Sequence, residues 1–333
     1  MRISRRRALT GLAGLGALSL AGSPARAQDA TPSAAGAWTF TDDAGKTVSL
    51  PEPPRRVVAD LNAASALWDF GVRPVAVSGW TIASDAAWGN VDRETPVINA
   101  DAAAPEPDLE MLLEIQPDLF VTVLWGDEDT LGPYAWSFTE PENYERVNDI
   151  VPVVGIFATG LADRNMERFA ELAGLLGADL ESPELLEAKE AYEQRVAQFS
   201  AQTQAHPELT ALFAHASGEG FSVANPEDWA DLSWFRTLGL NIIEPDIETG
   251  TFWEFLSAEQ AGTYQPDILF VSQRDESFTL EDLPGHPLYG MLPAVKAGQI
   301  GPWNQDMIQS YQGLEAALSS MLATLENAQK VTG

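Results

Sequence analysis

The 333-residue chain contains no cysteine, only four lysines and only three histidines. The lack of cysteine excludes disulfides, thiolate catalysis, thiolate metal sites and a lipid anchor on a signal-peptide cysteine. The histidines, His206, His215 and His286, do not show the spacing of metal ligands. We therefore expect no metal to be bound directly by protein side chains.

Basic residues are scarce in comparison with acidic ones. The chain has 19 lysines and arginines against 49 aspartates and glutamates, which gives a formal net charge of −30. This charge argues against nucleic acid or an anionic membrane as a partner. The hydrophobic content of 45% is typical of a globular protein, and the length allows two domains. Adaptation of the surface to salt is a hypothesis that composition does not decide.

The N-terminus has the features of an export signal in the usual order. Residues 4–9 read SRRRAL, which resembles a twin-arginine pattern, and an apolar stretch follows over residues 8–21. Ala25-Arg26-Ala27 then offers a cleavage site between small residues. We predict a signal peptide over residues 1–27 and export to the periplasm or outer cell surface, with a disordered basic tail as the alternative. The sequence leaves open whether the signal is cleaved or retained as an anchor.

After a predicted linker over residues 28–37, short apolar strands alternate with helical segments on both sides of a helical stretch. The predicted order is an N-terminal α/β lobe over residues 38–160, a helical connector over 161–206 and a C-terminal α/β lobe over 207–333. Strands are expected at 57–60, 75–78, 97–99, 119–123, 151–156, 209–215, 221–224, 241–244 and 268–272, after a hairpin at 38–50. Helices are expected at 63–70, 107–115, 229–238, 252–262 and 307–328.

The connector contains a long helix. Ser182 and Pro183 are a good N-cap and first residue, and the helical pattern then continues to residue 204. These 22 residues would span about 33 Å, enough to run from one lobe to the other. The predicted fold class is therefore α/β, with two Rossmann-like lobes of mainly parallel sheet, one long connecting helix and a cleft between the lobes.

One sequence unit occurs twice, as EMLLEIQPDLFV from Glu110 and EQAGTYQPDILFV from Glu259. Each copy predicts a helix, a turn at Gln-Pro-Asp and a buried strand. Both glutamates fall in the first helical turn, where a carboxylate also favours the helix dipole. Two matched copies, one in each lobe, predict two docking points for a dimeric partner.

Three separated segments read GKTVSLPEPPRRVVADLNAASALWDFGVRPVAVSGW, LEMLLEIQPDLFV and HPLYGMLPAVKAGQIGPW. They resemble segments of bacterial ABC-transporter substrate-binding proteins of the iron-siderophore, haem and cobalamin class. The resemblance extends from about Trp38 to Leu325. It implies two lobes joined by one helix, a ligand cleft between them, and a monomer that delivers a metal chelate to a permease dimer with its ATPase. Glu110 and Glu259 occupy the motif positions whose glutamates dock onto permease arginines.

The resemblance leaves the ligand open among ferric siderophores, haem and cobalamin. A ferric siderophore would bring its Fe³⁺ already chelated, so no cofactor is expected. A receptor that feeds a sensor instead of a transporter is the alternative. Catalysis is not expected, because there is no Gly-x-Ser-x-Gly elbow and no phosphate-binding glycine loop after a strand.

In open α/β sheets the ligand lies beyond the carboxyl ends of the strands. The candidate ligand-binding residues follow predicted strands or begin predicted helices on that side: Asn62, Trp80, Trp125, Trp229, Trp253, Arg274 and Trp303. Tryptophans suit a large organic ligand, although core packing is the alternative for each. Arg274 would pair with an anionic group of the ligand, or else with Asp275 or Glu276 on the surface.

Overall fold

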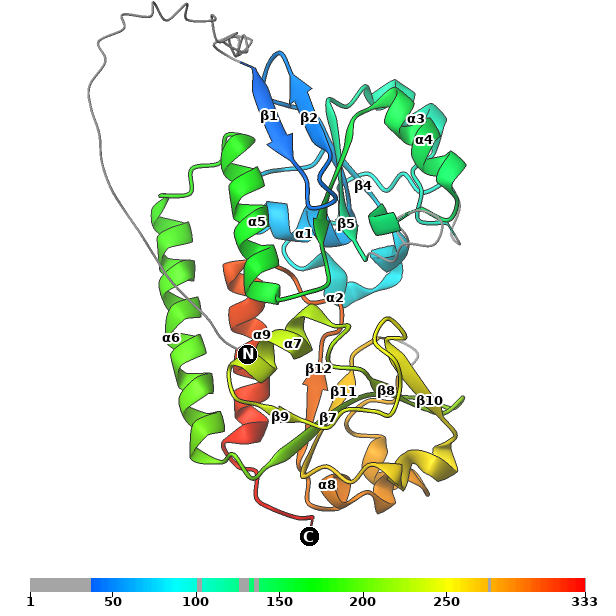
Figure 1. The fold of residues 1–333 in the computed structure, drawn as a ribbon, viewed down its shortest axis with the longest axis vertical. Coiled ribbons are helices and arrows are strands. Elements are labelled where there is room, and N and C mark those ends of the chain that lie inside the picture. The colour runs from blue at the N-terminus through cyan, green and yellow to red at the C-terminus, as the bar shows by residue number, and fades with distance from the viewer. Residues whose placement is uncertain (1–36, 101–103, 126–131, 135–137, 275–276, 333) are drawn as a thin grey trace, which may run out of the picture. The chain divides into compact units, whose positions relative to one another are not determined.

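The computed structural model describes residues 37–332 except 101–103, 126–131, 135–137 and 275–276. The predicted signal peptide and all but the last residue of the predicted linker lie outside these residues. Two open sheets, each covered by helices, lie beside one long helix (Figure 1). The predicted fold class is confirmed.

The N-lobe, as we call the first sheet and its helices, follows a hairpin of β1 (Trp38–Thr41) and β2 (Thr47–Leu50). Its sheet is wholly parallel and has the order β4-β3-β5-β6. The strands are β3 (Val57–Asp60), β4 (Ala76–Ser78), β5 (Leu119–Leu124) and β6 (Val153–Phe157). The helices are α1 (Leu61–Asp69), α2 (Asp85–Trp88), α3 (Leu109–Ile115), α4 (Pro141–Ile150) and α5 (Ala162–Leu175), with 3-10 turns η1 (Trp80–Ala83) and η2 (Gly132–Tyr134).

The C-lobe has a mixed sheet with the order β10-β8-β7-β11-β12, and β9 also pairs with β7. Its strands are β7 (Thr210–Ala216), β8 (Phe221–Ala224), β9 (Asn241–Ile242), β10 (Trp253–Leu256), β11 (Ile268–Ser272) and β12 (Ile300–Trp303). Its helices are α7 (Ala230–Thr237), α8 (Pro293–Lys296) and α9 (Tyr311–Leu325), with 3-10 turns η3 (Ala258–Thr263), η4 (Leu283–Gly285) and η5 (Tyr289–Met291). The strand β7 pairs in parallel with β9 and β11, and β11 pairs in parallel with β12. The strand β8 pairs antiparallel with both β7 and β10.

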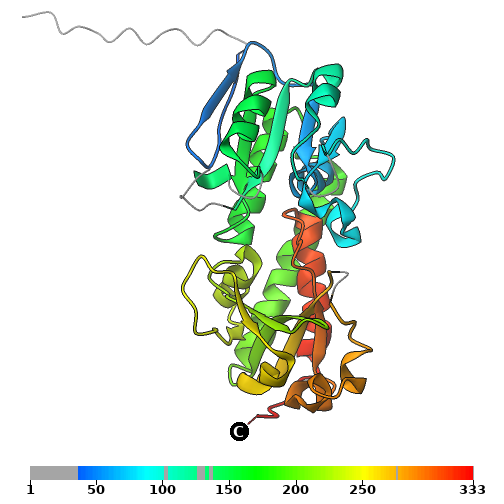
Figure 2. The same cartoon turned by 90° about the vertical axis from the view of Figure 1, so that its right-hand side faces the viewer.

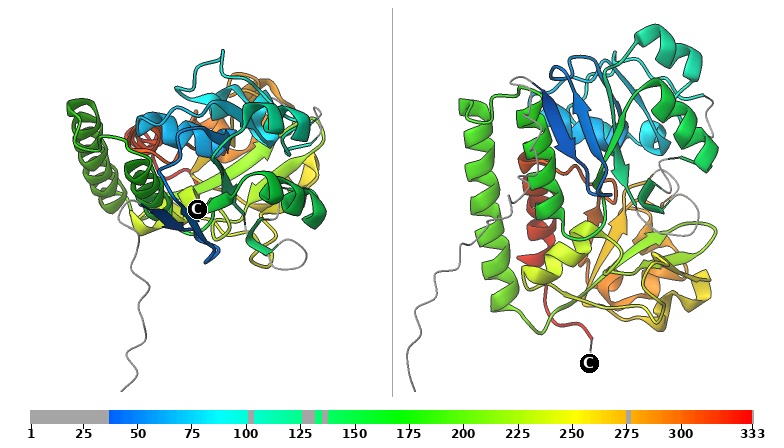
Figure 3. Two further views of the ribbon diagram at one scale, coloured as in Figure 1. Left: turned by 90° about the horizontal axis from the view of Figure 1, so that it is seen from above. Right: turned by 45° about the horizontal axis from the view of Figure 1, so that its top comes forward.

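The long helix is α6 (Pro183–Ala205), whose 23 residues span about 34 Å. Ser182 caps it as predicted, because the Ser182 hydroxyl accepts a hydrogen bond from the Leu185 N–H. In Figures 2 and 3, α6 runs along both lobes with α9 packed against it.

Two predicted elements are wrong. Residues 97–99 form only isolated bridges, to Val77 and Pro107, and do not extend a strand. The predicted helix at 252–262 is instead the strand β10 followed by the 3-10 turn η3. The second copy of the repeated unit therefore begins with a 3-10 turn where the first begins with the α-helix α3. The helix α4 was not predicted.

The aspartate of each Gln-Pro-Asp has the same structural task. Asp118 accepts hydrogen bonds from the N–H groups of Arg55 and Arg56, just before β3. Asp267 accepts from the N–H and hydroxyl of Thr210, at the start of β7. Each carboxylate thus ties the turn before one strand to the beginning of the strand that pairs with it.

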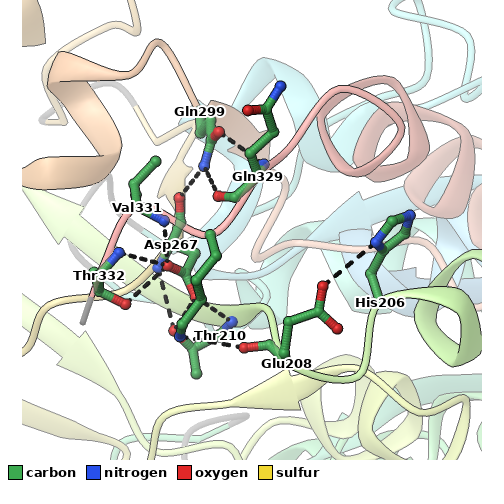
Figure 4. Close-up of polar contacts among 9 residues, drawn as sticks. His206, Glu208, Thr210, Asp267, Gln299, Gln329, Val331 and Thr332 are labelled. Atoms are coloured by element: carbon green, nitrogen blue, oxygen red, sulfur yellow. Dashed lines mark hydrogen bonds and ion pairs between the residues drawn. The ribbon is translucent and has the colours of Figure 1, made fainter.

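Asp267 also holds the C-terminal segment (Figure 4). One carboxylate oxygen accepts from the Val331 N–H at 2.9 Å and from the N–H and hydroxyl of Thr332 at 3.0 and 2.8 Å. The other pairs with the Lys330 ammonium at 2.9 Å. Asp267 is 0% exposed, so these donors replace its lost hydration.

Candidate ligand-binding cleft

The strand order of the N-lobe reverses between β3 and β5, and the cleft lies at their carboxyl ends. Asp60 ends β3 and caps α1 by accepting from the Ala63 N–H at 2.8 Å. Its second oxygen accepts from the hydroxyl of Thr122 and the N–H of Val123, which fixes β5 beside β3. Burial raises the pKa of Asp60, although these hydrogen bonds oppose the shift.

This arrangement places two predicted ligand-binding residues at the N-lobe side of the cleft. Asn62 is the second residue of α1, two positions after the cap Asp60. Its side-chain oxygen accepts a hydrogen bond from the Thr81 hydroxyl at 2.8 Å. Trp125 follows β5 directly. Thr81 belongs to η1, which begins at Trp80, so Asn62 also fixes the loop that carries that tryptophan. Trp80 is 52% exposed.

The C-lobe contributes the start of α7 and the end of β12. Trp229 is the residue before α7, and Asp231 lies in the first turn of that helix. Trp303 ends β12, and its indole N–H donates to the Asp231 carboxylate at 2.6 Å. Burial raises the pKa of Asp231 to about 6, against the lowering effect of the Trp303 hydrogen bond and the backbone.

Four predicted tryptophans and one phenylalanine form an aromatic cluster: Trp125, Trp229, Phe252, Trp253 and Trp303. The Trp229 ring lies at the centre, with ring centroids 5.9 Å from Trp125, 5.7 Å from Phe252, 5.2 Å from Trp253 and 5.3 Å from Trp303. All four of these pairs are edge-to-face, a favourable arrangement for aromatic rings. Since Trp125 comes from the N-lobe and the others from the C-lobe, the aromatic cluster joins the two sides of the cleft.

Phe252 was missed by the sequence analysis, and its backbone is unusual. Its φ of 62° lies in the left-handed region, where an aromatic residue is strained. The Phe252 N–H donates to Asp228, and its carbonyl accepts from the Asn225 N–H and the Trp229 indole. These bonds hold the Phe252 ring against Trp125 at 6.1 Å.

A small cavity lies beside the aromatic cluster, between residues of the two lobes. Its lining includes Asn62, Val123, Trp125 and Ala158 from the N-lobe and Trp229, Ala230, Asp231, Gln305, Asp306, Met307 and Gln309 from the C-lobe. Its volume of about 20 Å³ is room for about one water molecule. Ligand pockets for larger molecules measure several hundred Å³, so a chelate requires the two sides to separate.

An ion pair between the half-exposed Arg274 and the buried Asp306 borders this cavity. Arg274 contacts both carboxylate oxygens of Asp306, at 3.1 and 2.5 Å, and the Asp306 side chain is only 2% exposed. Asp306 also accepts from the Ser84 hydroxyl of the N-lobe at 3.0 Å. The predicted surface partners of Arg274, Asp275 and Glu276, lie outside the described residues.

The residues between β12 and α9 were also missed, although they follow a strand end as Trp303 does. They include Gln305, Asp306 and Gln309. Gln305 lies against Ser272 and the Arg274 guanidinium. The Gln309 side chain is buried, and its Oε1 has no hydrogen-bond partner among the described residues. Extending the rule of strand carboxyl ends past Trp303 would have found this segment.

The two candidate docking glutamates are exposed in the first turns of their helices. Glu110 lies in α3, which Asp108 caps by accepting from the Met111 N–H at 2.9 Å. Glu259 lies in η3, where Ser257 and Gln260 form a capping box. Glu110 also borders a hollow of about 390 Å³ on the N-lobe, with Arg146 in its lining. In Figure 1, α3 lies on the side of the N-lobe away from α6.

Two further observations limit the chemistry of the described region. No three side chains of histidine, aspartate or glutamate gather there closely enough to hold a metal ion. None of its helices combines the length and apolarity that a membrane span requires.

Residues 66–306 match the family model described as periplasmic binding protein. The chain belongs to the periplasmic binding protein family. The ferric-siderophore receptor protein DesE from Streptomyces coelicolor has a similar structure, with a TM-score of 0.79. It is 30% identical over 89% of this chain and 100% of that one. The predicted family is thus confirmed.

More distant members resemble the chain as well. The Fe(3+)-citrate-binding protein YfmC from Bacillus subtilis is 21% identical over 84% of this chain and 82% of its own length. The catecholate-siderophore binding protein VctP from Vibrio cholerae is 21% identical, with a TM-score of 0.60, over 87% of this chain and 99% of that one. At this identity the structural likeness to VctP supports the fold alone.

Proposed function

We propose that this protein is the extracytoplasmic solute-binding component of an ABC importer and captures a ferric siderophore in the cleft between its lobes. The observation that carries the proposal is the aromatic cluster at the strand ends of both lobes, in a chain 30% identical to a ferric-siderophore receptor. Trp229 and Trp303 are buried within this cluster, so separation of the two sides would present their π surfaces to an organic chelate. The ligand arrives with its iron already chelated, so the protein needs no metal ligands of its own.

Capture is tested by titrating the purified chain, lacking residues 1–27, with ferric siderophores, haem and cobalamin. A ferric siderophore is expected to quench tryptophan fluorescence and to raise the melting temperature, because a ligand at about 100 times its Kd stabilises by about 2.7 kcal/mol. The ligand should be recovered unchanged. Haem or cobalamin binding without any siderophore binding would refute the ligand class, and turnover of the ligand would refute the binding-only role.

Delivery rests on Glu110 and Glu259, which we assign as the docking points for a permease dimer. Both carboxylates are exposed and are placed by matching units of the two lobes. Hydrogen bonds from its own backbone and from Ser257 lower the pKa of Glu259, which keeps it charged. Basic side chains on two permease subunits would each meet one glutamate.

The docking test compares two double variants in an uptake assay with the cognate permease. Glu110→Ala with Glu259→Ala should abolish uptake of the bound chelate and leave its Kd unchanged. Glu114→Ala with Glu281→Ala removes the same charge from exposed positions and should leave both uptake and Kd unchanged. Normal uptake by the first double variant would refute the docking assignment without affecting ligand capture.

Export through the twin-arginine route completes the proposal, since the solute must be met outside the cytoplasm. Replacing Arg5, Arg6 and Arg7 by lysine should retain the protein in the cytoplasm, as measured by cell fractionation. An unchanged exported fraction would refute this route and leave ligand binding unaffected.

A further inference from the structure

The charge of the cleft restricts which ferric chelates can enter it. We infer that the protein selects neutral or cationic ferric chelates over polyanionic ones, and that Asp231 is the carboxylate that makes this selection. This inference rests on the proposed function, because it concerns the ligand of the same cleft. It separates this chain from relatives named for Fe(3+)-citrate or a catecholate siderophore.

The first argument is the inventory of basic side chains. Fourteen lysines and arginines follow residue 36, and none of them falls in the four internal gaps of the described residues. All fourteen positions are therefore known. None belongs to the described lining of the cavity. A polyanionic chelate needs cationic partners to replace its lost hydration, and this lining supplies none.

Arg274 is the basic residue that contacts a cavity-lining side chain, and it is already neutralised. Its guanidinium makes two contacts to Asp306, whose side chain is almost fully buried. An anionic ligand that drew Arg274 away would leave the Asp306 carboxylate buried with only the Ser84 hydroxyl. Arg274 itself is half-exposed, but leaving the buried Asp306 carboxylate without its partner is unfavourable, so Arg274 does not serve as an anion receptor.

Seven of the other basic residues have acidic partners elsewhere. Their ion pairs are Arg93–Asp85, Arg164–Glu167, Arg168–Asp43, Lys189–Glu193, Arg195–Glu315, Arg236–Glu244 and Lys330–Asp267. None of these carboxylates lines the cavity. Arg55 and Arg56 lie at the amino end of β3, the opposite edge of the sheet from the cleft.

The second argument is what the cavity does present. Asp231 lines it with a carboxylate that has the Trp303 indole, but no basic side chain, as a described side-chain partner. Gln309 adds the unpaired, buried end of its amide. An unsatisfied buried polar group is unfavourable, and a polar group of the ligand would satisfy it. An ammonium or amide N–H of the ligand can donate to the Asp231 carboxylate or to the Gln309 Oε1. A carboxylate or catecholate oxygen would instead be repelled by the negative charge of Asp231.

The test measures the affinities of four iron complexes by calorimetry. They are a linear ferric trihydroxamate with a free ammonium, the same complex N-acetylated, a ferric tricatecholate and ferric citrate. We expect the two trihydroxamates to bind about 100-fold more tightly than the tricatecholate or citrate, a difference of about 2.7 kcal/mol. Asp231→Asn keeps an oxygen for the Trp303 N–H and should reduce this ratio about tenfold.

Glu187→Gln removes the same charge from an exposed position of α6 that does not line the cavity and should leave the ratio unchanged. Equal or tighter binding of the tricatecholate or citrate would overturn the inference while chelate capture stands. An unchanged ratio in Asp231→Asn would overturn the role of Asp231. Failure of all four complexes to bind would overturn the proposed function itself.

Discussion

Replacing Asp267 by asparagine tests whether its buried carboxylate holds the C-lobe together. One oxygen accepts three hydrogen bonds from Val331 and Thr332, and the other accepts from Thr210 and Lys330. An asparagine must turn its NH₂ toward one of these sets of donors, so rotating the amide does not relieve the conflict. Charge-assisted hydrogen bonds contribute about 1.5–3 kcal/mol each, and disrupting a buried pair costs about 3–5 kcal/mol. We expect Asp267→Asn to lower the free energy of unfolding by roughly 3–5 kcal/mol.

Asp118→Asn is the matched control, because it changes the same position of the other repeated unit. Asp118 is exposed, and only one of its oxygens accepts described hydrogen bonds, from Arg55 and Arg56. An asparagine at position 118 can keep its side-chain oxygen on those two N–H groups, so we expect the free energy of unfolding to fall by less than about 1 kcal/mol. Urea unfolding followed by circular dichroism at pH 7 measures both variants. Equal losses in the two variants would refute the reasoning.

The pH dependence of Asp267 gives a second readout. Burial alone would raise its pKa, but hydrogen bonds from Thr210, Lys330 and the C-terminal segment outweigh burial and hold it well below the usual range. The folded state therefore binds this proton less readily than the unfolded chain. The stabilisation is present above about pH 4, the unfolded value, and is lost as the pH falls further. The difference in the free energy of unfolding between the wild type and Asp267→Asn should therefore become smaller as the pH is lowered below about 4.

Three other predictions concern the cleft. The folded pKa of Asp231 is raised to about 6, so its contribution to stability falls as the pH rises from about 4 to 6. Asp231→Asn should therefore raise the free energy of unfolding by roughly 1–3 kcal/mol at pH 7, as measured by urea unfolding. An unchanged free energy of unfolding would contradict burial as the cause of the raised pKa. Arg274→Met should lower the free energy of unfolding by about 2–4 kcal/mol, and adding Asp306→Asn should restore most of that loss. If the losses of the two single variants instead add in the double variant, Arg274 and Asp306 are not energetically coupled. Trp125→Ala or Trp80→Ala should weaken chelate binding about tenfold by calorimetry. Trp68→Ala should keep the wild-type Kd, because Trp68 lies within α1 instead of in a loop that follows a strand and does not line the cavity.

The sequence predicted those parts of the fold that local patterns determine. The strands β3, β5 and β11 are mostly apolar runs, and the cap at Ser182 begins α6 as expected. Residues 253–256 could not be assigned in this way. They are a strand because the antiparallel partner β8 lies beside them, and such a partner is not visible in the local pattern of apolar residues.

The candidate site was predicted in part, for a similar reason. Strand ends were visible, so Asn62, Trp125 and Trp303 could be named. Asp231 and Asp306 could not be distinguished from the many other acidic residues, because their burial and their partners come from distant parts of the chain. Their significance depends on which opposite charges are near, and only the folded structure shows that.

The segment between β12 and α9 has a consequence for how the protein discriminates by size. Asp306 and Ser310 hydrogen-bond to Ser84 and Asp69 of the N-lobe, and Ile308 lies against Gly89. If the lobes separate while these contacts persist, the segment is the axis about which they turn. Points near an axis move little and distant points move far, so Asp306 and its neighbours keep their positions while the distant parts of the two lobes diverge. Such a receptor would be strict about the charge of its solute and tolerant of its bulk.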